Sequence, residues 1–167
     1  MSSTQTVRGP FDPADVSWTA VSPRLGTARL TIAGVVLLPF LVAAVLLAVL
    51  VGAAWLWVLP AVVVLLLAWV VWLVPRQVRA MAYAERADDL LVRRGILFRS
   101  MVVVPYGRMQ YVDVTAGPVA RRFGFASVEL HTASPSTTAS IEGLPPQEAA
   151  RLRDRLASRG EARLAGL

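Results

Sequence analysis

The stretch LTIAGVVLLPFLVAAVLLAVLVGAAWLWVLPAVVVLLLAWVVWLV, residues 30–74, decides the fold of this chain. None of its 45 residues is Asp, Glu, Lys, Arg or His. As one straight helix it would extend roughly 67 Å, whereas the hydrocarbon core of a bilayer is about 30 Å thick. A small soluble domain could not bury two helices that are apolar on every side, so we predict a transmembrane hairpin.

A patch of small residues at 52–54 divides this stretch into predicted spans of about 30–51 and 55–74. Each span has close to the roughly 20 residues that one crossing needs. Indole rings favour the headgroup region, and arginines next to a span hold its end in the same region. The predicted interface anchors are therefore Trp55, Trp57, Trp69, Trp72, Arg76 and Arg79. We expect the second span to end at Pro75-Arg76.

Arginines flank the hairpin on both sides, and the turn inside it has no charge. By the positive-inside rule, we expect a multi-pass membrane protein with both termini in the cytoplasm. Residues 1–29 are predicted to be a cytoplasmic arm. A cleaved signal peptide is the competing prediction, but the apolar run is too long and a second span follows it. No ionisable group lies within either span, so neither offers a residue for an ion pathway.

Composition limits what the rest of the chain can be. Its 167 residues are 56% hydrophobic with a mean hydropathy of +0.57, which leaves room for the hairpin and one small domain. The chain has no cysteine, which excludes disulfides and thiolate metal sites. All 17 of its cationic side chains are Arg, and the formal net charge is +6.

The positive charge is unevenly distributed. Residues 76–125 contain nine arginines and four acidic residues, whereas residues 126–167 contain five of each. An Arg near an anionic leaflet contributes about 1 kcal/mol to membrane adhesion. The alternative is that these charges only enforce topology and solubility.

After Pro75 the sequence changes to patterns typical of short strands. Alternation or β-branched residues predict strands at 90–94, 96–104, 110–115, 126–132 and 137–141. Pro145-Pro146 opens a predicted helix that ends near Gly160 and has Ala149, Leu152 and Leu156 on one face. We therefore predict a small antiparallel sheet or barrel over 77–160, capped by a C-terminal helix, with residues 161–167 as a tail.

Four motifs follow the hairpin in a specific order: PYGRMQ at 105–110, GPVARRFG at 117–124, TAS at 132–134 and IEGLP at 141–145. Together with the hairpin, they resemble the YdbS-like bacterial pleckstrin-homology-like (PH-like) membrane proteins. The resemblance covers the chain from about Trp18 to Arg159. Met109 stands where that family usually has a branched aliphatic residue, and Phe125 where it commonly has Leu.

The resemblance implies an α+β protein of the bacterial inner membrane in which the hairpin precedes a seven-stranded, strongly bent barrel closed by the C-terminal helix. It implies no enzyme and no cofactor. Members are thought to work with multi-domain relatives, so the expected partner is a multi-domain PH-like membrane protein or a second copy, besides membrane lipids. Some members are linked to bacteriocin resistance or export. Phosphoinositide binding is not implied, because fold and ligand are separable.

The candidate interaction surface consists of Arg108, Gln110, Arg121 and Arg122. If Pro118 starts a helical turn that closes at Gly124, the arginines at 121 and 122 lie in its last turn and can satisfy its free carbonyls. The functional alternative places them with Arg108 on one exposed rim, for headgroup phosphates or an acidic partner segment. Arg108 and Gln110, which follow a proline, can instead bond to neighbouring backbone.

Catalysis has little support in the sequence. The single histidine, His131, alternates with Glu129 and Ser127 on the predicted solvent face of a strand. No G-x-S-x-G, phosphate-binding glycine loop, zinc signature or nucleic-acid recognition motif occurs. We therefore predict no metal, no cofactor and no nucleic-acid partner. The predicted function is a non-enzymatic interaction module that assembles with a membrane protein, and the alternative is an anionic-lipid-binding module with an Arg-rich face.

Overall fold

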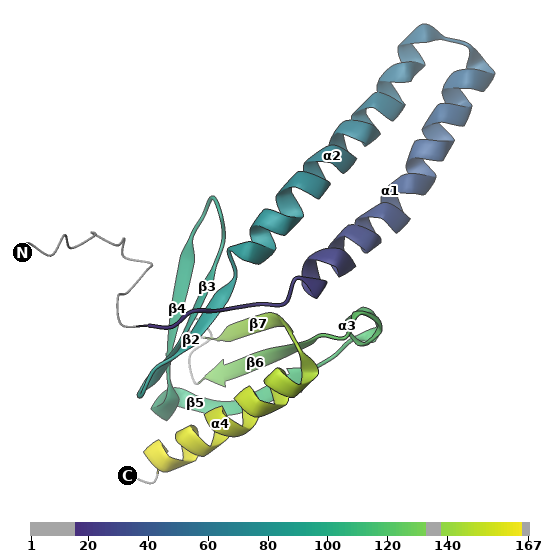
Figure 1. Ribbon diagram of the computed structural model, residues 1–167. Coiled ribbons are helices and arrows are strands. Elements are labelled where there is room, and N and C mark those ends of the chain that lie inside the picture. The colour runs from purple at the N-terminus through teal and green to yellow at the C-terminus, as the bar shows by residue number, and fades with distance from the viewer. Residues whose placement is uncertain (1–15, 133–137, 165–167) are drawn as a thin grey trace, which may run out of the picture.

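The computed structural model describes residues 16–132 and 138–164. Two apolar helices, α1 (Arg24–Val51) and α2 (Val58–Arg79), form a long antiparallel hairpin that projects from a smaller mixed domain (Figure 1). Between them, Gly52 in the left-handed conformation and the 3-10 helix η1 (Ala54–Trp57) make the turn. Only 6% of the most apolar window of each helix is buried. Surface of this kind is stable when lipid covers it, so the predicted transmembrane hairpin is confirmed.

The second helix extends further than the sequence pattern indicated. It continues through Pro75 to Arg79, where the N–H of Ala80 bonds back to the carbonyl of Arg76 at 3.1 Å. Proline keeps a helical φ and removes one hydrogen-bond donor, and transmembrane helices tolerate it. The helix therefore continues past Pro75-Arg76, and the end of the membrane span at these residues stays a prediction.

Seven antiparallel strands form two sheets in the described part of the chain. The first sheet has the order β1-β2-β3-β4, formed by Thr19–Ala20, Ala82–Glu85, Asp89–Arg94 and Ser100–Pro105. The second has the order β5-β6-β7, formed by Met109–Thr115, Ala126–Thr132 and Ala139–Leu144. The sheets are open, so the closed barrel implied by the resemblance is corrected. The 3-10 helix η2 (Tyr106–Arg108) separates β4 from β5 and carries the chain from one sheet to the other.

The transmembrane hairpin is an insertion between two paired strands. Thr19 pairs with Tyr83 and Ala20 with Ala82, so β1 before the hairpin lies against β2 after it. Part of the predicted 1–29 arm therefore belongs to the domain, and residues 1–15 lie outside the described residues. Because the chain enters and leaves the hairpin through one sheet, the domain is tied to both of its helices.

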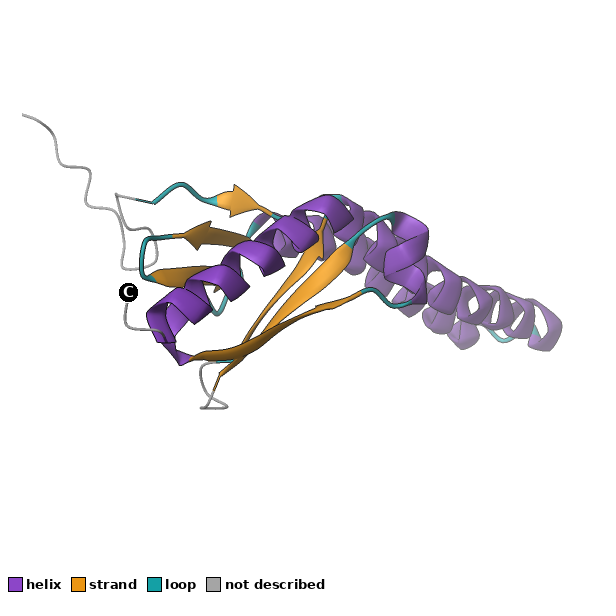
Figure 2. Ribbon diagram, turned by 90° about the horizontal axis from the view of Figure 1, so that it is seen from below, coloured by secondary structure: helices purple, strands orange, loops and turns teal. Residues whose placement is uncertain are grey.

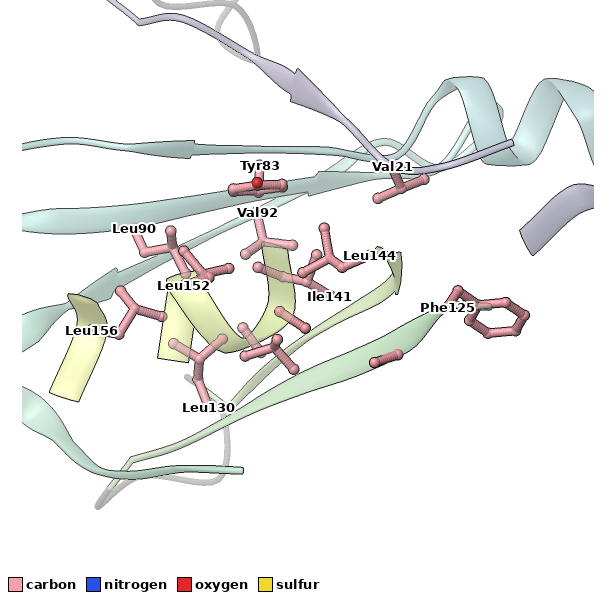
Figure 3. Close-up of a cluster of buried hydrophobic side chains, with 14 of the residues drawn as sticks. Val21, Tyr83, Leu90, Val92, Phe125, Leu130, Ile141, Leu144, Leu152 and Leu156 are labelled. Carbon is pink, nitrogen blue, oxygen red and sulfur yellow. The ribbon is translucent and has the colours of Figure 1, made fainter. Parts of the chain in front are cut away.

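The core lies between the two sheets and the C-terminal helix α4 (Pro146–Leu164). Figure 2 shows α4 crossing the strands, and Figure 3 shows Leu152 and Leu156 pointing toward side chains of both sheets. These two leucines and Ala149 are fully buried, which confirms the apolar face predicted for this helix. The short helix α3 (Pro118–Phe123) links β5 to β6, so the helical turn considered for residues 118–124 is present, and it ends at Gly124 in the left-handed conformation.

Candidate functional site

The first turns of α1 dock onto the edge strand β7. Leu25 packs against Gly143, which has no β-carbon in the way and whose φ of +78° also favours glycine. The N–H of Ser22 donates to the Gly143 carbonyl at 2.8 Å, and the Arg29 guanidinium pairs with the Glu142 carboxylate at 2.7 Å. These contacts add to the β1–β2 pairing and hold the domain in a defined orientation at the base of the hairpin.

Helix α3 is attached to the same base. The Arg24 guanidinium donates to the Gly124 carbonyl at 3.2 Å. The last carbonyls of α3 accept from backbone, namely Gly124 N–H to Arg121 at 3.4 Å and Phe125 N–H to Ala120 at 2.9 Å. Since backbone groups make this cap, the predicted capping role for the side chains at 121 and 122 is not what the structure has.

The arginines of α3 are left exposed. Arg121 and Arg122 lie next to Val119, which is also exposed, and neither arginine forms an ion pair within the described residues. The arginines of α4 differ, because Arg151 and Arg155 are both paired with Glu85. We call residues 119, 121 and 122 the α3 face.

The other two predicted surface residues lie elsewhere. Arg108 and Gln110 are exposed at the start of β5, and Gln110 falls in an irregularity of the β5–β6 register. The α3 face follows the opposite end of β5, roughly 20 Å away along a seven-residue strand. The rim that was to hold Arg108 with Arg121 and Arg122 is therefore not formed.

The predicted interface anchors fall at the two ends of the hairpin. Trp55 and Trp57 are exposed in η1 at its tip. At its base, the Arg76 guanidinium lies 3.6 Å from the ring centroid of Trp72, a cation–π contact that puts charge and aromatic surface at one level. Trp69 is exposed one turn before Trp72, toward the tip of the hairpin, and Arg79 is exposed in the last turn of α2. Their role at the interface stays a prediction.

A network of side chains fastens α4 to the first sheet. The buried Tyr83 hydroxyl donates to Glu148 at 2.6 Å, and Arg151 donates to both Glu148 and Glu85. The Arg151 hydrogen bonds, and then that of Tyr83, lower the pKa of Glu148 to about 2. Burial, followed by Glu148, raises the pKa of Tyr83. All of these groups have partners, so the network stabilises the packing of α4 on the first sheet and does not have the features of a catalytic acid–base pair.

A second fastening lies at the far end of α4. Arg159 donates to the Arg86 carbonyl at 2.6 Å and to the Tyr106 hydroxyl at 2.9 Å, and that hydroxyl donates to the same carbonyl at 3.1 Å. Burial raises the pKa of Tyr106, so its hydroxyl stays neutral. The tyrosine of the PYGRMQ motif therefore closes the junction between β4, β5 and α4.

His131 is partly covered by an aromatic neighbour. Its ring stacks on that of Tyr111 with centroids 4.2 Å apart, and its Nε2 lies 3.8 Å from Glu129. Within residues 16–132 and 138–164, no group of three His, Cys, Asp or Glu side chains is arranged to hold a metal ion. The geometry around His131 is that of a cross-strand pair on the outer face of a sheet.

Comparison with known proteins agrees with this architecture. A family model described as Bacterial PH domain matches residues 24–160, which include both helices of the hairpin and end within α4. The chain belongs to the Bacterial PH domain family. Over 72 residues it is 36% identical to the UPF0699 transmembrane protein YdbS of Bacillus subtilis (strain 168). That match covers 43% of this chain and 44% of the relative, less than half of its length. No solved structure matches significantly.

The Bacterial PH domain match begins at Arg24, the first residue of α1, so the hairpin is part of the family unit. Sequence reasoning missed the contacts that join the hairpin to the domain, such as Leu25 on Gly143. A tight reversal is expected at Gly95, but the strand predicted to begin at residue 96 begins only at Ser100. The apolar residues directly after Gly95 belong to the turn between β3 and β4, where Leu97 and Phe98 are exposed.

Proposed function

We propose that this protein is a non-enzymatic interaction module, anchored in the bacterial inner membrane with both termini in the cytoplasm. In this proposal its PH-like domain assembles with a partner membrane protein at the cytoplasmic face, a multi-domain PH-like protein or a second copy. The process served by such an assembly would be bacteriocin resistance or export. A tag on either terminus that is accessible only from outside the cell would contradict this orientation.

The observation that carries the proposal is the α3 face beside the base of α1. Its two arginines have no ion pair in the described chain, and the exposed Val119 adds apolar area next to them. The bond from Arg24 to the Gly124 carbonyl connects this face to the first turn of α1. An acidic segment next to the membrane anchor of a partner would pair with these arginines. Because the anchor already restricts the orientation of that segment, the entropic cost of association is lower.

Charge reversal on the α3 face tests the proposal. The full chain is extracted from native membranes in mild detergent, and its companions are identified. We expect a defined companion that is lost with R121E/R122E and kept with R153E, which reverses an exposed arginine of α4. A photo-crosslinker at Val119 should join that same companion. Recovery of the chain alone under gentle conditions, or equal recovery from both variants, would reject the assembly.

The alternative function is anionic-lipid binding, supported by the excess of arginine in residues 76–125. It predicts that the full chain in mixed nanodiscs enriches anionic lipid, that salt weakens the enrichment, and that alanine at Arg108, Arg121 and Arg122 abolishes it. Enrichment that persists in this triple variant would show that these arginines do not bind the lipid, and this conclusion does not depend on the result of the partner experiment.

A further inference from the structure

The turn between β3 and β4, residues 95–99, exposes two large apolar side chains. Leu97 and Phe98 are each 87% exposed, more than any other large hydrophobic residue that the structure describes. The turn is tightly built, because Gly95 has a φ of +96° and a β-carbon there would collide with the Phe98 carbonyl. The chain therefore presents an apolar tip on a defined scaffold, and exposed apolar surface of this kind marks an interaction site.

This tip lies beside the base of α2. Figure 1 shows the β3–β4 hairpin rising along the lower part of that helix, and Leu97 and Phe98 line one cavity together with Trp69 and Trp72. Since Trp72 is followed at Arg76 by the first charge after the apolar run, this level of α2 corresponds to the membrane–water interface. The tip therefore reaches the same depth as the aromatic residues of the second span.

The cavity between α2 and the tip has a volume of about 690 Å³, within the range of small-molecule sites. Its walls are mainly apolar, formed by Trp69, Trp72 and Leu73 on one side and Ile96, Leu97 and Phe98 on the other. One wall is the surface of a transmembrane helix. An acyl chain of the same leaflet can therefore enter without passing through water, which favours a lipid as the occupant.

The charged side chains that line the cavity are all positive. Arg76 and Arg94 line it, Arg99 is exposed at the end of the turn, and no acidic residue lines it. Arg76 lies over Trp72 and has no carboxylate partner among the described residues. A mainly apolar cavity lined by two arginines complements a phospholipid, whose phosphate accepts bidentate bonds from arginine.

We propose that residues 96–98 insert into the cytoplasmic leaflet as a wedge and that the cavity holds one phospholipid. Its acyl chain lies between Trp69 and Phe98, and its phosphate lies between Arg76 and Arg94. Two positive charges favour phosphatidylglycerol over the zwitterionic phosphatidylcholine. This site is separate from the α3 face and does not depend on a protein partner.

Depth measurement tests the wedge. The chain has no cysteine, so single cysteines at Leu97 or Phe98 can carry an environment-sensitive dye on the full chain in nanodiscs. We expect a blue-shifted emission that lipids brominated near the headgroup quench, as for a label at Trp72. A label at Arg108, at the other end of β4, should remain in water. Emission at Leu97 equal to that at Arg108 would overturn the insertion.

Lipid retention tests the cavity. Native mass spectrometry of the full chain released from nanodiscs of mixed phosphatidylglycerol and phosphatidylcholine should show one retained phosphatidylglycerol. Retention should fall roughly fivefold for each of R76A and R94A, and should be lost in L97S/F98S. R79A is the matched control, because Arg79 lies in the same last turn of α2 but does not line the cavity.

The variants at Leu97 and Phe98 remove little packing, because both side chains are largely exposed, and an unchanged thermal unfolding midpoint would verify this. Equal lipid retention in R76A/R94A and R79A would overturn the phosphate site. Retention of phosphatidylcholine in place of phosphatidylglycerol would overturn the charge preference. A crosslink from Phe98 to another protein instead of lipid would show that a partner helix occupies the cavity, which also overturns the proposal.

Discussion

Leu25 of α1 rests on the bare backbone of Gly143 in β7. A β-carbon built on Gly143 would lie 2.9 Å from the Leu25 β-carbon, and the Gly143 φ is +78°. This contact, with the Ser22–Gly143 and Arg29–Glu142 bonds, joins the hairpin to the edge of the second sheet, while β1 and β2 join it to the first. The position of the domain relative to the hairpin therefore depends in part on a glycine.

Replacing Gly143 with Ala should weaken this docking. The added methyl group meets Leu25 and the backbone conformation disfavours any side chain, so we expect a loss of about 2 kcal/mol or more in the free energy of unfolding. Thermal unfolding of the full chain in nanodiscs, followed by near-UV circular dichroism, measures it. Gly34→Ala is the control, because Gly34 has no atom within 4 Å of an added β-carbon and no positive φ. Equal stability of the two variants would contradict the docking.

The Arg29–Glu142 ion pair should contribute modestly to the same junction. Its atoms are 2.7 Å apart, but both side chains are partly exposed, so solvent screens the attraction. A double-mutant cycle with R29A and E142A should give a coupling free energy of about 0.5 kcal/mol that decreases at high salt. A coupling near zero at low salt would mean that Leu25 and the backbone bonds hold the junction alone.

Acid should loosen α4 through Glu148. The pKa of this carboxyl is lowered from its ordinary value of 4.5 to about 2 in the folded chain, first by Arg151. A lowered folded pKa gives stability that is present above pH 4.5 and lost as the pH falls toward 2. E148Q should therefore flatten the dependence of the unfolding midpoint on pH between about 5 and 2. Full wild-type dependence in E148Q would assign the acid sensitivity to other carboxylates.

Removing the Tyr106 hydroxyl should destabilise the far end of α4. Y106F deletes the bond to the Arg86 carbonyl and the bond from Arg159, both in a buried place, for an expected loss of about 1–2 kcal/mol. Y111F is the matched control, because Tyr111 is exposed and its hydroxyl makes no bond that the described chain shows. Chemical denaturation of both variants gives the comparison, and a neutral Y106F would leave the helix held by Arg159 and the leucines.

Elements whose cause is local could be predicted well. The strands predicted at 110–115 and 126–132 agree with β5 and β6, because apolar and polar residues alternate along a half-buried strand and this pattern is visible in the sequence. The turn from Pro118 to Gly124 was predicted from a proline and a glycine at the two ends of one helical turn. The run at 96–104 was misread, because its first residues form a turn whose apolar side chains face outward instead of a strand.

Elements whose cause lies across the chain were missed. Two residues, Thr19 and Ala20, form a strand only because Tyr83 and Ala82 lie opposite them. The predicted rim failed in the same way, since Arg108 and Arg121 are near in sequence but stand at opposite ends of an extended strand. Backbone amides of Gly124 and Phe125 cap α3, an arrangement that a glycine after the last helical residue favours, whereas the sequence analysis considered the arginine side chains for this role.

The sequence by itself determined that this chain crosses a membrane twice and carries a small α+β domain. An uncharged run of 45 residues forms two helices that are apolar on every side, and a domain this small cannot cover them, so lipid must. Only the tertiary structure decided how the domain stands under that hairpin, because this follows from a glycine under Leu25, a strand completed across the insertion and an apolar turn brought beside Trp72. Contacts between residues distant in sequence leave no periodic trace, so they appear only once the chain is folded.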